Sequence, residues 1–139
     1  LSPDVSHVIV HDAARPAVPY TDIDALFEAA EPGDKSAIVL SAPLRSSLIE
    51  LDPTGHPINY HLAQSFAQIL TPQVIKRERF IQMAESKTEI PPYEVELLKG
   101  SPLNVRIGGS GDASFAKAML NMLPKPKIKA ASPFEEAQW

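Results

Sequence analysis

The chain has 139 residues, of which 44% are hydrophobic and 22% charged, a size and composition typical of one globular domain with a single core. Its formal net charge of -4 argues against binding to a nucleic-acid polymer, although a single nucleotide fits, and the lack of cysteine excludes disulfide bonds and thiolate metal sites. No apolar run approaches the roughly 20 residues that cross a membrane, so we expect no membrane association and a cytoplasmic location.

Strands and helices are predicted to alternate in the first forty residues. Val8 to Val10 is a short, β-branched apolar run, as in a strand that is buried on both faces. An amphipathic pattern from Asp22 to about Ala30 predicts a helix, and Ala37 to Leu40 predicts a second buried strand. Because such a unit crosses over right-handed, we expect the two strands to pair in parallel.

The segment from about Leu44 to Gln68 is predicted to form a protruding arm. Asp52-Pro53-Thr54-Gly55 is a strong turn signal, and the residues on either side of it alternate as strands do. These runs mix polar and apolar residues without a clear core face. We therefore expect a β-hairpin that extends away from the main sheet.

The next segment predicts a helix followed by two strands. Thr71 is placed to cap a helix that continues to about Ser86, with Pro72 at its first position. Val95 to Leu98 and Leu103 to Ile107 have the short apolar pattern of strands.

A last helix is predicted from Ser110, with one apolar stripe along it. From Pro124 the sequence is rich in Pro, Lys and Ala. We therefore expect a single α/β domain over residues 1–123, with the arm at about 44–68, and a flexible tail over 124–139.

The run from His11 to Pro16, "HDAARP", directly follows the first predicted strand. Ligands of open α/β sheets bind beyond the carboxyl ends of the strands, which is where this run must lie. Asp12 could hold a metal or a sugar hydroxyl, Arg15 could bind a phosphate, and the small Ala13 would let a ligand approach the backbone. In the alternative interpretation Asp12 caps a turn and pairs with Arg15 on the surface.

Arg106 is a second candidate, because its strand leads to the glycine-rich turn from Gly108 to Gly111. This turn could cradle an anion at the start of a helix, but it matches no P-loop and lacks the P-loop lysine, and such a stretch is more often a flexible cap. Arg106 could also be a plain surface residue. Zinc-ligand spacing is absent from the four histidines, so we expect no histidine metal site: His7, His11, His56 and His61.

Four motifs occur in the order and spacing of a known family: VIVHDAARPAVP, SAIVLSAPLRSSL, ILTPQVIKRERF and LLKGSPLNVRI. By these motifs, the chain from about Val8 to Leu123 resembles the 2-C-methyl-D-erythritol 4-phosphate cytidylyltransferases of non-mevalonate isoprenoid biosynthesis. The resemblance implies a nucleotidyltransferase fold of the glycosyltransferase-A-like, Rossmann-like kind, with a mostly parallel sheet and an arm that interlocks two subunits into a homodimer. It also implies cytidylyl transfer from CTP to methylerythritol phosphate, releasing diphosphate in the presence of Mg²⁺.

The resemblance also implies roles for individual residues. Arg106 falls where the family has a lysine that positions the substrate phosphate for attack, so it is the implied catalytic residue. Asp12 and Arg15 fall at positions on the methylerythritol phosphate side of the site, and Ser47 falls where the family has an arm threonine. Asp12 and Ala13 would lie against the nucleotide.

The sequence departs from the family pattern at several places. The family's glycine-rich CTP loop would precede Val8 and is not in this sequence, and Ala63 stands near the position of an arm arginine. The segment from Lys87 to Pro92 is too short for the family's Thr-Asp-acid motif, and Arg106 replaces lysine with the same charge but a different geometry.

We interpret the chain as the C-terminal part of a cytidylyltransferase. Two alternatives stay open. One is a catalytically inactive relative that serves as a dimerising interaction module. The other is a nucleotidyltransferase for a different sugar or polyol phosphate, which the changes at Ala63 and Arg106 would permit.

Overall fold

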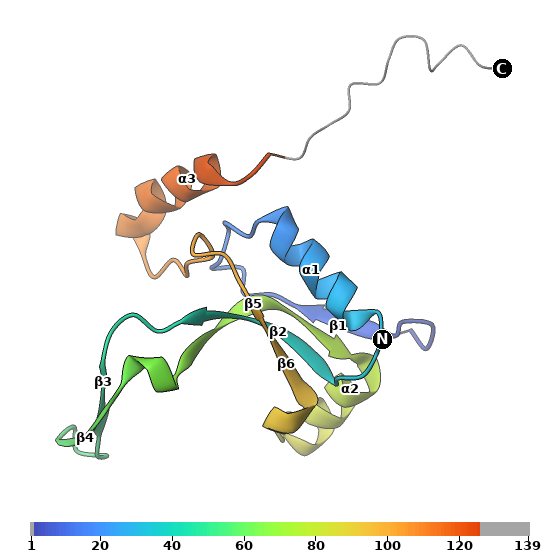
Figure 1. Cartoon of the computed structure of the whole chain (residues 1–139), viewed down its shortest axis with the longest axis horizontal. Coiled ribbons are helices and arrows are strands. Elements are labelled where there is room, and N and C mark those ends of the chain that lie inside the picture. Colours follow the sequence, from blue (N-terminus) through green and yellow to red (C-terminus); the bar gives the residue numbers. More distant parts are fainter. Residues whose placement is uncertain (1, 126–139) are drawn as a thin grey trace, which may run out of the picture.

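The computed structural model describes residues 2–125, so the part of the predicted tail from residue 126 lies outside the described residues. Four strands form the main sheet in the order β1-β5-β2-β6 (Figure 1): β1 His7–Val10, β2 Ala37–Pro43, β5 Ala67–Lys76 and β6 Val95–Lys99. Two strands form a separate sheet: β3 Leu48–Leu51 and β4 Pro57–His61. The α-helices are α1 Tyr20–Ala30, α2 Arg77–Ser86 and α3 Ala113–Met122. Three single turns are 3₁₀-helical: η1 Ala63–Ser65, η2 Pro92–Glu94 and η3 Ser110–Asp112.

The main sheet confirms the predicted α/β class, with three of its strands pointing the same way. β2 pairs with β6 in parallel, and β5 is antiparallel to both β1 and β2. The prediction that β1 and β2 pair directly is wrong, because β5 lies between them. The chain returns from the arm along β2 in the opposite direction, and this long-range pairing is not visible in the local β1–α1–β2 pattern.

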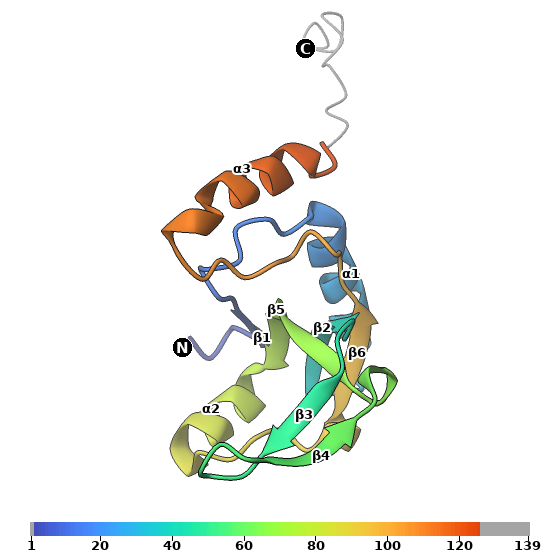
Figure 2. The ribbon, with the colours of Figure 1, turned by 90° about the vertical axis from the view of Figure 1, so that its left-hand side faces the viewer.

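The core lies on both faces of β2, which explains why the sequence of this strand is continuously apolar. Ile38 and Leu40 pack into one cluster with Leu26 of α1, whereas Ala37 and Val39 pack into the other, which includes Phe80 of α2. Alternate residues of a strand point to opposite faces, so α1 and α2 cover opposite sides of the sheet, as Figures 1 and 2 show.

The predicted helix from Thr71 begins later than expected. Thr71 and Pro72 lie inside β5, and the helix α2 starts at Arg77. Val74 and Ile75 are buried as strand residues between β1 and β2. A short apolar run does not distinguish a strand from a helix, and here the partners on both sides determine the conformation.

The predicted strand from Leu103 to Ile107 is wrong, since this segment is an irregular loop that leads to α3. Its backbone is anchored to the loop after β1, because the amide of Ile107 donates a hydrogen bond to the carbonyl of Ala14 at 2.8 Å. Figure 2 shows this segment and the loop after β1 beside α3. The loop therefore joins the end of β6 to the region beyond β1.

The arm forms as predicted, with β3 and β4 as an antiparallel pair apart from the main sheet (Figure 1). Asp52 stabilises the turn, because its Oδ1 accepts hydrogen bonds from the backbone amides of Thr54 and His56 at 2.8 and 2.9 Å. Every residue of β3 is exposed. The arm therefore presents apolar side chains that the described chain leaves uncovered.

Gly100, directly after β6, allows the loop to approach the core closely. A Cβ atom here would lie 2.8 Å from Leu70 Cδ1 and 3.3 Å from Leu40 Cβ, both on fully buried side chains. We expect Gly100→Ala to lower the free energy of unfolding by about 1 to 3 kcal/mol in urea denaturation. Gly109→Ala is the control, because a Cβ atom there meets nothing within 4 Å and its φ of -173° is extended. Equal losses in both variants would contradict the packing argument.

Candidate functional site

The loop after β1 and the loop after β6 meet beyond the end of β1. Arg106 Nε donates to Asp12 Oδ2 at 2.8 Å, which joins two residues 94 positions apart in the sequence. Arg15 Nη1 donates to the backbone carbonyl of Asn104, also at 2.8 Å. The structure thus brings together three of the residues that the sequence singled out, and we call this region the crest site: Asp12, Arg15 and Arg106.

Asp12 is held as a carboxylate by the backbone and by Arg106. Asp12 Oδ1 accepts a hydrogen bond from the backbone amide of Ala14 at 2.9 Å. The backbone amide of Asp12 donates a hydrogen bond to Thr71 Oγ1 at 3.0 Å. The hydrogen bond from the Ala14 amide, followed by that from Arg106, lowers the pKa of the Asp12 carboxyl below its ordinary value of 3.8. The charged form is therefore the one that suits this loop.

Because the pKa of Asp12 is lowered, we expect the stability of the folded protein to decrease at acid pH. A carboxyl whose folded pKa lies below its unfolded value contributes stability above the unfolded value, near 3.8, and loses it as the pH falls through the folded pKa. We expect Arg106→Ala to raise the pKa of Asp12 only in part, because the Ala14 amide still donates. NMR titration of the carboxyl carbon measures this, and an unchanged pKa would contradict the contribution of Arg106.

Arg106 is the more exposed partner of this pair, with 60% of its side chain accessible to solvent. Within residues 2–125, Asp12 is the only group to which it is hydrogen bonded, and only through Nε. The terminal amino groups of its guanidinium remain available, and a planar fork of this kind binds phosphate oxygens in pairs. The geometry suits Arg106 to a phosphorylated ligand.

Arg15 lies differently, since only 6% of the residue is exposed. Its hydrogen bond to the Asn104 carbonyl ties the loop after β1 to the loop after β6. The surface pair between Asp12 and Arg15 is not formed, because Asp12 pairs with Arg106 instead. Its implied contact with substrate stays a prediction.

The two remaining candidates lie on exposed backbone. Ala13 is exposed in the turn between Asp12 and Arg15, which suits close approach by a ligand. Ser47 is exposed just before β3, at the base of the arm. No hydrogen bond within residues 2–125 joins Ser47 to the crest site, so a single described chain does not bring it there.

Two residues of the crest were missed by the sequence interpretation. Thr71 Oγ1 accepts the Asp12 amide, and Asn104 Nδ2 donates to the Thr71 carbonyl at 2.7 Å. Asn104 is only 2% exposed. Its position among apolar residues in "PLNVRI" was the available signal, whereas Thr71 was hidden by its interpretation as a helix cap.

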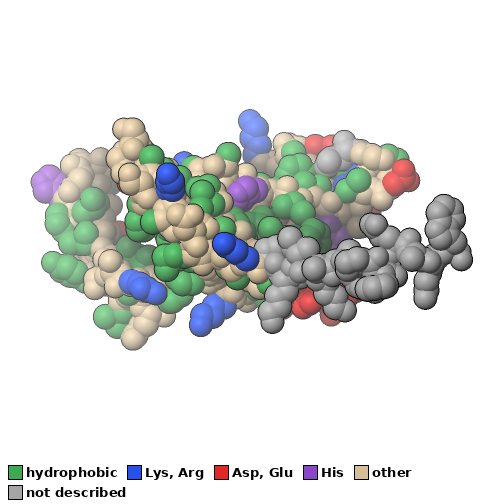
Figure 3. Space-filling model, turned by 90° about the horizontal axis from the view of Figure 1, so that it is seen from above, with side chains coloured by type: hydrophobic (Ala, Val, Ile, Leu, Met, Phe, Trp, Pro, Cys, Tyr) green, Lys and Arg blue, Asp and Glu red, His purple; other side chains and the backbone are tan. Residues whose placement is uncertain are grey.

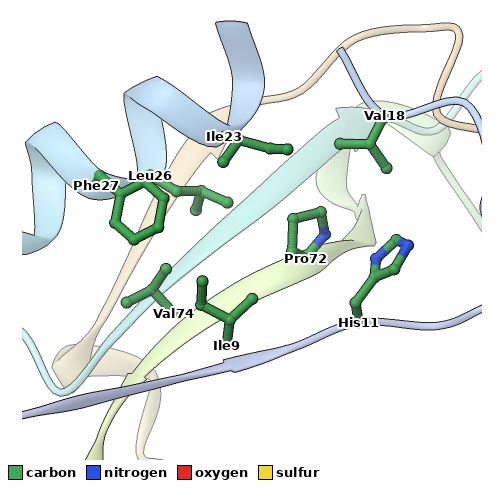
Figure 4. A pocket seen from close by; sticks show the side chains of 8 residues that line it. All are labelled: Ile9, His11, Val18, Ile23, Leu26, Phe27, Pro72 and Val74. Atoms are coloured by element: carbon green, nitrogen blue, oxygen red, sulfur yellow. The ribbon is translucent and has the colours of Figure 1, made fainter. Parts of the chain in front are cut away.

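His11 lines an apolar pocket of about 240 Å³ between α1 and the sheet, near Pro72 and Val18 (Figure 4). Its Nδ1 lies 3.2 Å from Thr71 Oγ1. The pocket wall is almost entirely hydrophobic side chains, which do not suit a phosphate. The contact with Thr71 orients His11, in agreement with a structural role.

The glycine-rich turn does not offer a free anion cradle. The amides of Gly108 and Gly109 donate to Asp112 Oδ2 at 2.8 and 3.2 Å. A carboxylate of the chain itself therefore occupies the position that an anion would take, and this favours the interpretation of the turn as a helix cap.

The described residues do not provide a ligand set for magnesium by themselves. They contain no group of three or more His, Asp or Glu side chains placed to hold a metal. Asp12 is the carboxylate of the crest site, and both of its oxygens are engaged. The Mg²⁺ that the resemblance implies stays a prediction.

On the face in Figure 3, Lys and Arg side chains are scattered among neutral and hydrophobic ones rather than gathered in a stripe. The expectation that no nucleic-acid polymer binds stays a prediction. None of the helices within residues 2–125 has the length and apolar character to span a bilayer.

Comparison with known proteins relates the chain to one family. The profile of the 2-C-methyl-D-erythritol 4-phosphate cytidylyltransferase family matches residues 1–122. A protein of that name from Streptomyces avermitilis is 33% identical over 95 residues, which cover 64% of this chain and 38% of that protein. The bifunctional enzyme IspD/IspF of Desulforudis audaxviator is 28% identical over 131 residues, which cover 85% of this chain and 33% of that protein.

Solved structures match the fold. The 4-diphosphocytidyl-2C-methyl-D-erythritol synthase of Anaerococcus prevotii superposes with a TM-score of 0.72 at 19% identity, covering 87% of this chain and 59% of that one. The 2-C-methyl-D-erythritol 4-phosphate cytidylyltransferase of Thermus thermophilus gives 0.67 at 23% identity, covering 84% and 62%. The chain thus spans about a third of the curated relatives and about three fifths of the solved structures.

Proposed function

We propose that this chain, which belongs to the 2-C-methyl-D-erythritol 4-phosphate cytidylyltransferase family, is part of a cytoplasmic enzyme that transfers a cytidylyl group from CTP to 2-C-methyl-D-erythritol 4-phosphate. The observation that carries the proposal is the contact between Asp12 and Arg106. These residues come from two separate family motifs and meet at one end of the sheet. As a result, the guanidinium of Arg106, whose terminal amino groups are available, lies beside the carboxylate of Asp12.

The residues of the crest site suit a reaction that depends on positioning and charge. A phosphate oxygen of methylerythritol phosphate attacks the α-phosphorus of CTP, a new P–O bond forms, and the bond to the β-phosphate breaks to release diphosphate. Arg106 would bind the attacking phosphate through its terminal amino groups, while Asp12 fixes the guanidinium through Nε. Ala13 leaves space for the nucleotide to approach the backbone.

Ala63 favours a second candidate, a related enzyme for another sugar or polyol phosphate. It is the first residue of η1, in the arm, where the resemblance implies an arginine that binds the substrate phosphate. Alanine supplies no charge there, so the acceptor must be held by other groups. The inactive, dimerising relative remains the third possibility.

An assay of the protein with CTP and a panel of phosphorylated acceptors tests the proposal. We expect formation of diphosphate and of a cytidylylated product with methylerythritol phosphate as the preferred acceptor. Turnover with another polyol phosphate and not with methylerythritol phosphate would favour the second candidate. No turnover with any acceptor, from protein that contains all segments of the family, would favour the inactive relative.

We further propose that the arm joins two copies of the protein into a homodimer. Tyr60 is 85% exposed, Leu62 lies two residues after it and is also exposed, and so are Leu48, Ile49 and Leu51 on the opposing strand. Exposed apolar side chains on a projecting hairpin are covered most simply by a second copy. Such a dimer would also bring Ser47 of one copy near a neighbouring surface.

Deletion of residues 51–58 is expected to convert the dimer into a monomer in light scattering, because it removes the tip of both arm strands. The double variant Tyr60→Ser with Leu62→Ser should have the same effect with less disruption of the backbone. Tyr93→Ser is the matched control, since Tyr93 is a comparably exposed aromatic residue of η2, outside the arm. An unchanged mass after arm deletion would show that the arm is not the interface.

A further inference from the structure

A pocket of about 630 Å³ lies beyond the carboxyl ends of the parallel strands β2 and β6. One wall is the base of the arm, residues 42–46, and the other is the loop of residues 99–105. Gln68 and Leu70 of β5 complete the lining. Ligands of open α/β sheets bind at this end of parallel strands, so the place itself suits a ligand.

This pocket is separate from the crest site. None of the residues discussed above as substrate or nucleotide contacts lines it: Asp12, Ala13, Arg15, Ser47 and Arg106. Asn104 connects the two regions. It lines the pocket, and its backbone carbonyl accepts the hydrogen bond from Arg15 Nη1 of the crest site.

Two cations without a partner line the pocket. Arg45 and Lys99 are both exposed, and neither makes a hydrogen bond or an ion pair within the described residues. No Asp or Glu of residues 2–125 lines the pocket, although the whole chain has 17 acids and 13 bases. The nearby Asp22 is buried, and its Oδ2 accepts the Ser101 amide at 2.8 Å. The pocket is thus a basic site in an acidic protein.

Neutral polar groups and a small apolar floor accompany the cations. Ser46 and Gln68 add a hydroxyl and an amide to the arm side of the lining. Asn104 is buried, and its Oδ1, which has no hydrogen-bond partner among the described residues, is shielded from solvent and so does not face the pocket. Leu70 and Pro43 supply apolar surface. This mixture suits a short carbon chain that carries hydroxyl groups.

We propose that this pocket is a second binding site, which takes the phosphate monoester of a small polyol. Arg45 and Lys99 bind the phosphate from opposite walls of the pocket, since two cations without acids nearby favour a doubly charged anion. The amide and hydroxyl groups of the lining hold the polyol hydroxyls. The ligand class matches the acceptor of the proposed function, but binding here does not depend on cytidylyl transfer.

Titration of the full chain with sn-glycerol 3-phosphate tests this proposal. Binding is measured from the amide chemical shifts in NMR spectra. We expect saturable shifts at Gly100 and Ser101, weaker binding of inorganic phosphate, and none of glycerol. Arg45→Gln and Lys99→Gln should each weaken binding of glycerol 3-phosphate by about fivefold to tenfold, as expected for the loss of a charge-assisted contact. Both residues are exposed, so the variants should melt like the parent chain.

Two control variants distinguish this site from other charges. Lys117→Gln removes an exposed cation of α3 and should leave binding unchanged. Arg106→Gln removes the cation of the crest site, where the proposed function also places a phosphate, so only the shifts at Gly100 and Ser101, which report on the pocket, should saturate as in the parent chain. Loss of binding only in Arg106→Gln would overturn the proposal and assign the ligand to the crest site. Affinity that is unchanged in Arg45→Gln with Lys99→Gln, or equal for inorganic phosphate and glycerol 3-phosphate, would also overturn it. None of these measurements uses turnover, so they stay informative if the proposed reaction is wrong.

Discussion

Arg106→Ala is expected to lower the rate of cytidylyl transfer at least about tenfold, with the melting temperature nearly unchanged. The substitution would remove the proposed charge-assisted contact to the substrate phosphate. Such a contact typically contributes about 1.5 to 3 kcal/mol, and tenfold corresponds to about 1.4 kcal/mol of lost transition-state stabilisation. Stability should change by only about 0.5 kcal/mol or less, because Arg106 is mostly exposed and Asp12 keeps its hydrogen bond from Ala14. Steady-state kinetics and thermal melting of the complete enzyme measure both effects.

Two further variants make this result specific. Arg106→Lys should retain more activity than Arg106→Ala, because lysine keeps the charge and is the residue implied by the resemblance. Arg79→Ala removes an arginine that pairs with Glu94 at 3.1 Å, away from the crest site, and should leave turnover unchanged. Turnover of Arg106→Ala at the unmutated rate would remove Arg106 from the site and make the acceptor doubtful.

Arg15→Ala is expected to destabilise the fold by about 3 to 5 kcal/mol. It removes a charge-assisted hydrogen bond to the Asn104 carbonyl, worth about 1.5 to 3 kcal/mol, together with a buried aliphatic stem at about 0.8 kcal/mol for each methylene. The melting temperature should fall by about 3 °C for each kcal/mol in a domain of this size. The loop after β6 should lose order at the same time, since Arg15 ties it to the loop after β1.

Arg15→Met separates packing from charge, because methionine fills most of the buried volume without the guanidinium. We expect it to melt between the unmutated protein and Arg15→Ala. If Arg15→Ala melts like the unmutated protein and instead loses affinity for the acceptor, then the implied role of Arg15 as a substrate contact is right and the structural role is secondary.

The sequence by itself determined those elements whose signals are local. The buried strand at Ala37, the helix that ends at Ala30 and the turn at Asp52 each follow from neighbouring residues: β-branched runs, helical periodicity and turn chemistry. The sequence also selected Asp12, because a residue that follows a strand of an α/β sheet lies where ligands bind. Arg106 was selected on a predicted strand that does not form, and by its match to the family's lysine. The contact between Asp12 and Arg106 could not be derived from spacing, since 94 positions separate them.

Only the tertiary structure decided which long-range partners form. Thr71 has the local chemistry of a helix cap, yet it lies inside β5, which pairs with β2 at residues 67–69 and 73–75, before and after Thr71. Arg15 has the local chemistry of an exposed phosphate ligand, yet the carbonyl of Asn104 draws it into the interior. In both cases the local preference is worth about 1 kcal/mol or less, whereas strand pairing and the burial of a satisfied charge involve several contacts that exist only once distant segments meet.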